Sequence, residues 1–254
     1  PAATLDVTGD GRARLDYLPE YIFSDAPVPV SLTLPVGFSP TLEADPGIPS
    51  FLYDLVPQGQ GRRLLVELLD LRDHDALVLP LVLAGAFNPI GALRLRSAVE
   101  FYRDHARRNP PPPDSVRGFT LAELGARREH AVEHLSTYAM LASGTTGVQG
   151  VSPKFLLAED GEGRLHADLA LDDANAFAHW LAKGPRNRSD ADRTVLRNEA
   201  AYLRVAAVCG LRVHAPERIH HGHDLLFLPR FDRKAGNGRV ERFHQESLAS
   251  LAVL

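Results

Sequence analysis

The chain has 254 residues, 44% of them hydrophobic and 24% charged, a composition typical of globular proteins with one large domain or two modest ones. Its formal net charge of −4 provides no basic surface, which disfavours nucleic acid and anionic membranes as principal partners. Cys209 is the single cysteine and cannot form an internal disulfide, and without a long apolar run or a secretory leader the chain is expected in the reducing cytoplasm.

The N-terminal part should mix short strands and helices. Short strands are predicted up to about Pro46, among them an edge strand at residues 28–35, where prolines bracket a β-prone run. Leucines at helical spacing predict a helix at residues 62–70, directly after a Gly-Gln-Gly breaker. Apolar alternation predicts a further strand at residues 90–95.

Residues 109–119 form the predicted boundary between two parts of the chain. The segment contains four consecutive prolines, which favour an extended spacer and cannot lie inside a helix. We therefore divide the chain into residues 1–108, this proline-rich linker and residues 120–254. Strands and helices occur on both sides of the linker, so the expected fold class is α+β.

The part after the linker should begin with a helix and continue as short strands. Thr120 and Glu123 form a capping-box pattern, and the helix that they start should run to about Leu141. The predicted strands that follow are residues 154–158, 164–170, 177–183, 213–220 and 225–231, with a last hairpin around 235–238. A long helix should begin at Ser189 and stop at Gly210. Its predicted packing face contains Val195, Glu199, Tyr202, Leu203 and Ala206.

A glycine-rich turn at residues 143–150 precedes the first of these strands. Gly144, Gly147 and Gly150 allow backbone amides to converge on an anion, and Lys154 adds a positive charge close by. A glycine-rich loop that binds nothing is the competing interpretation. A Walker loop and a dinucleotide fingerprint are excluded, because Gly-Lys-Ser/Thr is missing and a strand follows.

The order of the parts downstream is that of a kinase small lobe. In kinases a strand lysine binds the nucleotide phosphates and is held by a helix glutamate, an arrangement that stabilises charge. Lys183, at the end of a predicted strand, and Glu199, on the following helix, fit these two roles. Taken singly, each also fits a purely structural interpretation, as a strand end and a solvated helix residue.

Five ordered motifs resemble those of the HipA-type serine/threonine kinase toxins. They are the glycine-rich turn with Ser152-Pro-Lys154, His179-Trp-Leu-Ala-Lys183, Asn198-Glu199-Ala-Ala-Tyr202, Cys209-Gly-Leu-Arg-Val-His-Ala-Pro216 and Leu228-Pro-Arg-Phe-Asp-Arg233. Earlier segments are similar to the family's N-terminal subdomain, namely Val30-Ser-Leu-Thr-Leu-Pro35, Phe51-Leu-Tyr-Asp-Leu-Val-Pro57 and Ile90-Gly-Ala-Leu93. The resemblance covers nearly the whole chain. It implies a HipA-like N-terminal subdomain followed by a kinase-like small lobe, an antiparallel sheet with a packed helix.

The resemblance also implies an ATP site. The nucleotide-binding residues that it implies are Gly147, Gly150, Ser152, Lys154, Lys183, Glu199, Pro229, Phe231 and Asp232. Lys154 and Lys183 would contact the phosphates. The backbone around Pro229 and Phe231 would hydrogen-bond the adenine, and Asp232 would lie at the mouth of the pocket.

Two departures from the family pattern affect the expected activity. Gly147 stands at the position of the family's autophosphorylated serine, so only Ser143, Thr145 or Thr146 could take that role. The family's catalytic and Mg²⁺-binding aspartates correspond to positions beyond Leu254, so no catalytic residue and no metal ligand is expected within this chain. The chain alone should therefore be a poor kinase. The missing initial methionine and the uncapped helical pattern at its end predict a fragment.

The first functional hypothesis is an ATP-dependent serine/threonine protein kinase, a bacterial toxin of a type II toxin-antitoxin system in its full-length form. Its implied partners are a protein substrate and an antitoxin-like DNA-binding protein. The alternative is a regulatory module that binds nucleotide or a partner without turnover. Direct DNA binding is disfavoured by the net charge, and the arginine-rich stretch at residues 103–108 is expected to be a solvated helix face.

A histidine cluster late in the chain is not expected to bind a metal. The cluster consists of His214, His220, His221 and His223. Adjacent strand residues point to opposite faces, so His220 and His221 cannot easily share one ion. No cysteine or paired carboxylate completes a familiar zinc spacing. A polar hairpin turn explains the cluster.

Overall fold

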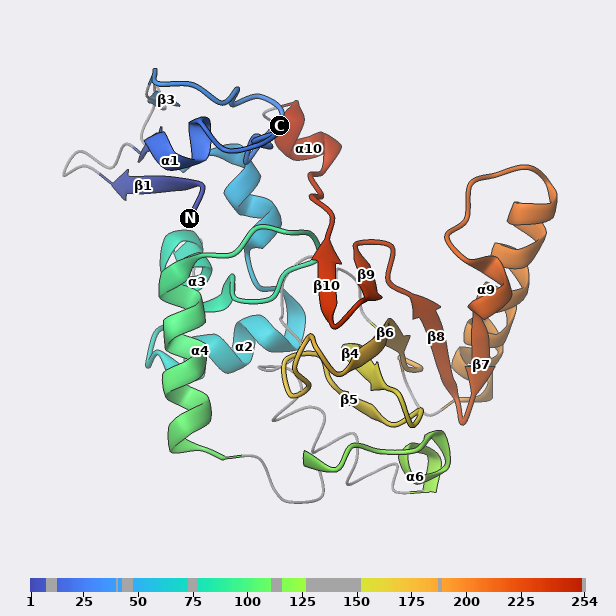
Figure 1. Ribbon diagram of the computed structural model, residues 1–254. Helices are drawn as coiled ribbons and strands as arrows, with labels where there is room; N and C mark the ends of the chain where they lie inside the picture. Colours follow the sequence, from blue (N-terminus) through green and yellow to red (C-terminus); the bar gives the residue numbers. More distant parts are fainter. Residues whose placement is uncertain are drawn as a thin grey trace.

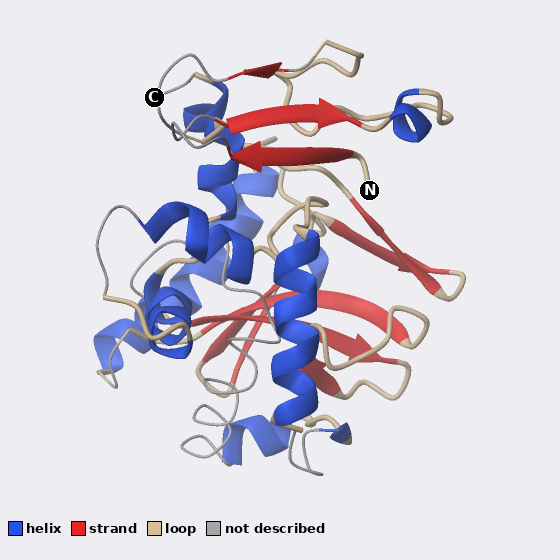
Figure 2. Ribbon diagram, turned by 90° about the vertical axis from the view of Figure 1, so that its left-hand side faces the viewer, coloured by secondary structure: helices blue, strands red, loops and turns tan. Residues whose placement is uncertain are grey.

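The computed structural model describes residues 1–7, 13–39, 41–42, 48–72, 77–110, 116–126, 152–186 and 189–252. It has the expected α+β fold, with antiparallel sheets of three, two and five strands among these residues (Figure 1). In Figure 2 the three-stranded and five-stranded sheets lie at opposite ends of the view, with helices beside and between them. None of the helices in the described ranges is long and apolar enough to span a bilayer.

The N-terminal part combines a small sheet with a group of helices. Its elements are β1 (Ala3–Val7), β2 (Ala13–Tyr17), α1 (Pro19–Ile22), β3 (Thr41–Leu42), the 3-10 helix η1 (Ser50–Leu55), α2 (Gly59–Leu68), α3 (Val78–Gly85) and α4 (Arg96–Arg108). The prediction of short strands before Pro46 is confirmed, and β2 lies between β1 and β3. Residues 78–85 carry no polar side chain, which explains why α3 is the most apolar helix of this part and packs against its neighbours.

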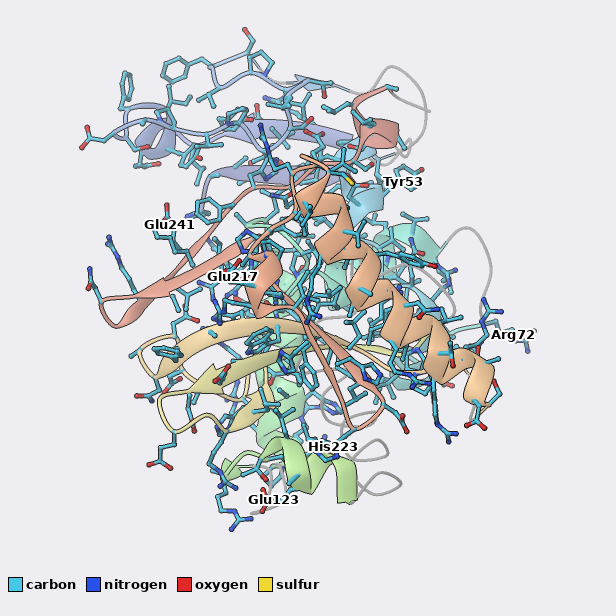
Figure 3. The ribbon with its side chains drawn as sticks, turned by 90° about the vertical axis from the view of Figure 1, so that its right-hand side faces the viewer. Tyr53, Arg72, Glu123, Glu217, His223 and Glu241 are labelled. Atoms are coloured by element: carbon cyan, nitrogen blue, oxygen red, sulfur yellow. The ribbon has the colours of Figure 1, made fainter. Side chains whose placement is uncertain are left out.

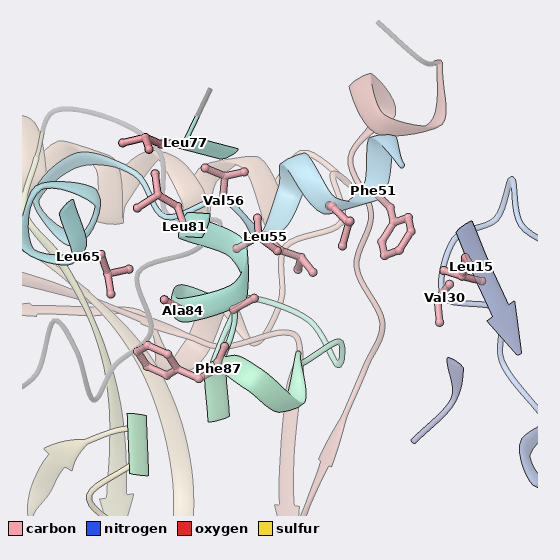
Figure 4. Close-up of a cluster of buried hydrophobic side chains, with 14 of the residues drawn as sticks. Leu15, Val30, Phe51, Leu55, Val56, Leu65, Leu77, Leu81, Ala84 and Phe87 are labelled. Atoms are coloured by element: carbon pink, nitrogen blue, oxygen red, sulfur yellow. The ribbon is translucent and has the colours of Figure 1, made fainter. Parts of the chain in front are cut away.

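One hydrophobic core holds this part together. Leu65 of α2 and both Leu81 and Val82 of α3 are fully buried. Phe87, which follows α3, stacks on Tyr102 of α4 with ring centroids 4.9 Å apart. Figure 4 shows Leu65, Leu81, Ala84 and Phe87 close together, and Leu15 and Val30 of the small sheet region further along the same cluster. Helix α4 therefore belongs to the same packing unit as the residues before it.

Two predicted strands of this part are wrong. Residues 28–35 form turns, with a single bridge between Ser31 and Leu34. The hydroxyl of Tyr17 donates to the Leu34 carbonyl at 2.7 Å and accepts from the Val30 amide at 2.9 Å. A side chain thus satisfies backbone groups that a strand would have paired with another strand.

Residues 90–95 are also irregular instead of extended in a sheet. Gly91 has a φ of 106°, which favours glycine, and Leu95 donates back to the Ala86 carbonyl at 3.0 Å. The helix predicted at residues 62–70 is present, but α2 already starts at Gly59. The Gly-Gln-Gly segment is therefore the first turn of the helix and not a breaker before it.

The second part is a five-stranded sheet with one long helix. Its elements are α6 (Leu121–Ala126), β4 (Lys154–Asp160), β5 (Leu165–Ala167), β6 (Ala176–Lys183), α9 (Asp190–Val208), the 3-10 helix η3 (Pro216–Arg218), β7 (His220–Gly222), β8 (Leu225–Pro229), β9 (Arg233–Gly236), β10 (Arg239–Arg242) and α10 (Leu248–Leu251). The sheet order is β5-β4-β6-β8-β7, while β9 and β10 form a separate hairpin.

Several local predictions for this part are confirmed. The Thr120 amide donates to the Glu123 carboxylate at 2.8 Å, and the Glu123 amide donates to the Thr120 hydroxyl at 3.2 Å, which is a capping box. The predicted continuation of that helix to Leu141 lies outside the described residues. The Ser189 side chain caps α9, and Gly210 follows its end with a φ of 84°.

The strand predicted at residues 213–220 is wrong for most of its length. Ala215 has a left-handed φ of 41° and Pro216 begins η3, so the backbone cannot stay extended there. Only His220 of that range lies in a strand, at the start of β7. The predicted strand at 225–231 ends at Pro229 as part of β8.

Helix α9 packs on the sheet through a face that matches the predicted one only in part, with Leu203 packed against this cluster as predicted. Val195 and Tyr202 are 61% and 70% exposed, whereas Leu196 and Ala200 are buried against the sheet. The helix carries apolar residues over a wide arc, so its sequence does not specify which edge of that arc packs. In Figure 3 α9 runs diagonally across the side that faces the viewer, in front of the strands.

The end of the chain returns to the N-terminal part. Helix α10 packs against η1, and Figure 1 shows it beside the N-terminal elements. The Glu246 carboxylate accepts from the Ser31 hydroxyl at 2.6 Å and from the Leu32 amide at 2.9 Å. The Ser247 amide donates to Asp54 at 2.7 Å. Contacts far apart in the sequence thus tie the two parts together.

Candidate functional site

Two lysines lie directly opposite each other on one face of the five-stranded sheet. Lys154 begins β4 and Lys183 ends β6, and the antiparallel register pairs their Cα atoms. Side chains of directly paired residues point to the same face, so the two positive charges are neighbours. Like charges at paired positions destabilise a sheet, and a negative group on this face would offset the repulsion between the two ammonium groups.

Glu199 supplies part of that negative charge. The Lys183 ammonium donates to both oxygens of the Glu199 carboxylate, at 2.6 and 2.9 Å. Packing of Leu196 and Ala200 against the sheet sets the rotation of α9, and this rotation brings Glu199 over the end of β6. The predicted ion pair is therefore present. Its side chains are 20% and 30% exposed, so both stay within reach of solvent and of a ligand.

Lys154 keeps a free ammonium group beside this pair. It forms no hydrogen bond or salt bridge with any residue in the described part of the chain. Burial and the neighbouring Lys183 lower the pKa of Lys154, and Glu199 offsets only part of this effect. A partly buried cation without a close counter-ion can form a strong charge-assisted hydrogen bond with a bound anion.

The same face becomes apolar one pair further along the strands. Leu181 of β6 and Leu228 of β8 are paired in the register, and both are half-buried. Leu156 of β4 pairs with Leu181 from the other side and is fully buried. The face thus presents a charged end followed by an apolar surface, which fits a ligand with an anionic tail and a flat apolar head.

The segment after β8 borders this apolar surface. Pro229 is buried and pairs with Trp180, while the Phe231 side chain is 53% exposed. The Arg230 amide between them donates to the His179 carbonyl at 3.0 Å, which extends the pairing of β6 and β8 by one residue. The backbone next to Pro229 and Phe231 is therefore anchored to the sheet at the edge of the candidate site.

Asp232 does not lie at the mouth of a pocket, and that prediction is wrong. Its side chain is fully buried, and its carboxylate accepts from Nε and Nη2 of Arg230 at 2.9 and 2.7 Å. It also accepts from Arg233 at 2.7 Å and from the Gly91 amide at 2.7 Å. Burial of a charged carboxylate is costly unless ion pairs and hydrogen bonds replace its contacts with water. For Asp232 these partners come from the N-terminal part as well as from its own segment.

A second buried carboxylate, Asp168, completes the network. It accepts from Arg230 at 2.7 Å and from the Asn88 amide group at 2.7 Å, and its other oxygen lies 2.7 Å from Nδ1 of His179. Sequence reasoning missed this network, because Asn88, Asp168 and His179 lie far apart in the chain and show no common spacing. The local signals were Asn88 in an otherwise apolar stretch and the three charged residues of Leu228-Pro-Arg-Phe-Asp-Arg233.

The two carboxylates make stability sensitive to acid. Burial opposes the ionised form of Asp168, but Arg230, His179 and Asn88 outweigh it and hold its pKa well below the ordinary 3.8. Burial likewise opposes the ionised form of Asp232, and its bonds with Arg230 and Arg233 lower its pKa. A depressed folded-state pKa gives stability that is complete above the unfolded-state value and is lost as the pH falls.

We therefore expect the free energy of unfolding to fall below about pH 4, by up to about 1.4 kcal/mol per pH unit for each carboxylate. Urea unfolding between about pH 5 and pH 2.5 measures this slope. In Asp168→Asn the slope should be shallower than in the parent, because one titrating group is gone. Equal slopes in the two proteins would show that Asp168 does not carry the effect.

Both parts of the chain match domains of one known family. Residues 1–96 match the HipA N-terminal domain, and residues 146–254 match the HipA-like C-terminal domain. The chain belongs to the HipA family. A search of curated proteins returned no match. In this HipA-family chain the paired lysines, Glu199 and the segment after β8 all lie in the C-terminal match, whereas Asn88 and Gly91 lie in the N-terminal match.

The other predicted site residues of this HipA-family chain lie just before β4. Gly147 and Gly150, with the rest of the turn at residues 143–150, lie outside the described residues. Ser152 is half-buried, and the Pro153 carbonyl after it accepts from the Gly184 amide at 2.8 Å. This bond fixes the start of β4 against the end of β6, which keeps Lys154 next to Lys183.

The histidines late in this HipA-family chain have structural neighbours. His220 stacks on Phe227 with ring centroids 4.8 Å apart and meets the edge of Trp180 at 5.3 Å. His223 and Asp224 have positive φ and form the turn between β7 and β8. Across the described ranges, the His, Cys, Asp and Glu side chains include no group of three or more that could hold a metal ion.

Proposed function

We propose that this HipA-family chain binds ATP on the face of the five-stranded sheet that carries Lys154 and Lys183. In its full-length form the protein would be a serine/threonine protein kinase of a toxin-antitoxin system, acting on a protein substrate in the cytoplasm. The observation that carries the proposal is the bidentate Lys183–Glu199 ion pair beside the free ammonium of Lys154. Kinases use a strand lysine held by a helix glutamate to bind nucleotide phosphates.

Each residue of the site would have a distinct task. Lys183, held in place by Glu199, would donate to phosphate oxygens without losing side-chain freedom at the moment of binding. Lys154 would add a second charge-assisted hydrogen bond from the neighbouring strand. Leu181 and Leu228 would cover one face of the adenine, and the backbone on either side of Arg230 would supply the polar contacts to its edge.

The chemistry that ATP supplies is transfer of its terminal phosphoryl group, for which Mg²⁺ neutralises charge in kinases. The described residues fit the phosphates, since Lys154 at the start of β4 and Lys183 at the end of β6 lie side by side there. None of them forms an acidic group suited to Mg²⁺, and we assign the metal to none of them. The partner protein and the substrate remain those that family membership suggests, an antitoxin and a hydroxyl-bearing protein.

The nucleotide site can be tested by isothermal titration of the chain with ATP. We expect binding at millimolar or lower concentration, and about tenfold weaker binding by Lys154→Ala, because one hydrogen bond between charged groups is lost. Lys234→Ala is the matched control, since Lys234 is exposed on β9, outside the five-stranded sheet, and its loss should leave affinity unchanged.

The outcome also separates two functions. If the chain binds ATP and the full-length protein transfers phosphate, the kinase proposal stands. If ATP binds but no phosphate is transferred by the full-length protein, the site serves a nucleotide-binding regulatory module. No binding of ATP at millimolar concentration, or equal losses in Lys154→Ala and Lys234→Ala, would show that this face is not the nucleotide site.

A further inference from the structure

The buried charge network joins the N-terminal part to the edge of the candidate nucleotide site. The Asp232 carboxylate and the Gly91 amide lie 141 positions apart in sequence and are 2.7 Å apart in space. Arg233 donates from the same region to the carbonyls of Gly91 at 2.7 Å and Pro89 at 3.1 Å. The short segment at residues 88–91 is thus bonded to two consecutive residues directly after Phe231.

The network also reaches the residue before Phe231. Arg230 bonds both Asp168 and Asp232, and its own amide donates to the His179 carbonyl at 3.0 Å. The side-chain amide of Asn88 donates to Asp168, the other carboxylate bonded by Arg230, at 2.7 Å. Phe231 therefore stands between two residues, Arg230 and Asp232, whose side chains are only 1% exposed and fully bonded.

From this geometry we propose that Asn88 and Gly91 of the N-terminal part are positioning residues for residues 229–231, and so for nucleotide binding. The inference rests on the function proposed above. It adds that the N-terminal part regulates the nucleotide site through the buried network, and that displacing residues 88–91 weakens nucleotide binding.

The physical reason is that a buried charge is stable only while all of its partners are in place. Removing one partner from a buried ion pair leaves a charge that has neither water nor a counter-ion, so the remaining groups must rearrange. If residues 88–91 withdraw, Asp168 and Asp232 lose hydrogen bonds while Arg230 stays between them. The backbone at 229–231 is then free to move. The nucleotide's adenine binds less well, because this backbone must be ordered on binding. Because coupling is reciprocal, bound nucleotide should also hold residues 88–91 in place.

A second junction between the two parts offers a matched control. Ser31 is fully buried like Asn88 and bonds Glu246 at 2.6 Å, but none of its partners belongs to the network around Arg230. Both Asn88→Ala and Ser31→Ala remove one buried polar group from a contact between the two parts. Only Asn88→Ala removes a bond that leads to residues 229–231.

The experiment compares ATP affinity of the parent chain, Asn88→Ala and Ser31→Ala by isothermal titration, with thermal unfolding to confirm that each is folded. We expect about tenfold weaker binding by Asn88→Ala and less than about twofold change for Ser31→Ala. Hydrogen exchange without nucleotide supplies an independent readout. Amides at residues 230–233 should exchange faster in Asn88→Ala, while those of β4 and β6 keep the parent rate.

The outcomes separate this inference from the proposed function. Unchanged affinity and unchanged exchange in a folded Asn88→Ala overturn the inference, as does an equal loss of affinity in Ser31→Ala. If the parent itself binds no ATP, the proposed function fails and the regulatory inference fails with it, whatever the exchange rates show. Should Asn88→Ala not fold, Arg233→Lys replaces it, since lysine retains the charge next to Asp232 but lacks the two terminal nitrogens with which Arg233 bonds Gly91 and Pro89 separately.

Discussion

If the proposed kinase function holds, Lys183→Ala is expected to reduce phosphoryl transfer about a hundredfold or more, which corresponds to about 3 kcal/mol in the barrier. The Lys183 ammonium is held by two bonds to Glu199 and lies beside Lys154, so no other described cation is fixed at the same point. Its removal would also leave Glu199 as an unpaired negative charge beside the proposed phosphate position. ATP affinity should fall together with the rate.

The measurement is a phosphoryl-transfer assay with ATP, run with titration calorimetry on the same proteins. Lys234→Ala is the control, since it also removes one lysine and leaves the site intact. Lys183→Arg gives a further check, because the charge stays but the guanidinium is larger and cannot occupy the same position over Glu199. A Lys183→Ala protein that transfers phosphate at the parent rate would rule out the charge role of this lysine.

Arg230→Ala is expected to lower the free energy of unfolding by about 3–5 kcal/mol, the cost of leaving buried charges without their partner. The Arg230 guanidinium bonds Asp168 and Asp232, and all three side chains are 1–3% exposed. Since most domains are stable by only about 5–15 kcal/mol, this variant should be markedly less stable at room temperature.

Guanidinium chloride unfolding at neutral pH measures this loss. Arg239→Ala is the matched control, because Arg239 is exposed on β10 and its removal should change stability by no more than about 0.5 kcal/mol. The difference between the two variants should shrink at low pH, where protonation of Asp168 and Asp232 removes the charges that Arg230 neutralises. Similarly small losses of unfolding free energy in both variants at neutral pH would show that the bonds of Arg230 to Asp168 and Asp232 do not stabilise the fold.

The sequence alone determined the features that depend on neighbouring residues. The capping box at Thr120 and Glu123, the cap at Ser189 and the stop at Gly210 are local hydrogen-bonding and backbone effects, and the structure contains them. The motif order identified the family, and the ion pair of Lys183 and Glu199 was predicted from a strand and a helix adjacent in the chain.

Only the tertiary structure decided which apolar face is buried and where the charges go. Val195 and Leu196 are equally apolar, so periodicity could not tell which of them packs on the sheet, and contact with β7 and β8 selected Leu196. Asp232 resembles a pocket residue in its motif, but Arg230, Arg233 and the Gly91 amide enclose it. Burial of a charge depends on partners brought from distant positions, and such partners leave no periodic signal in the sequence.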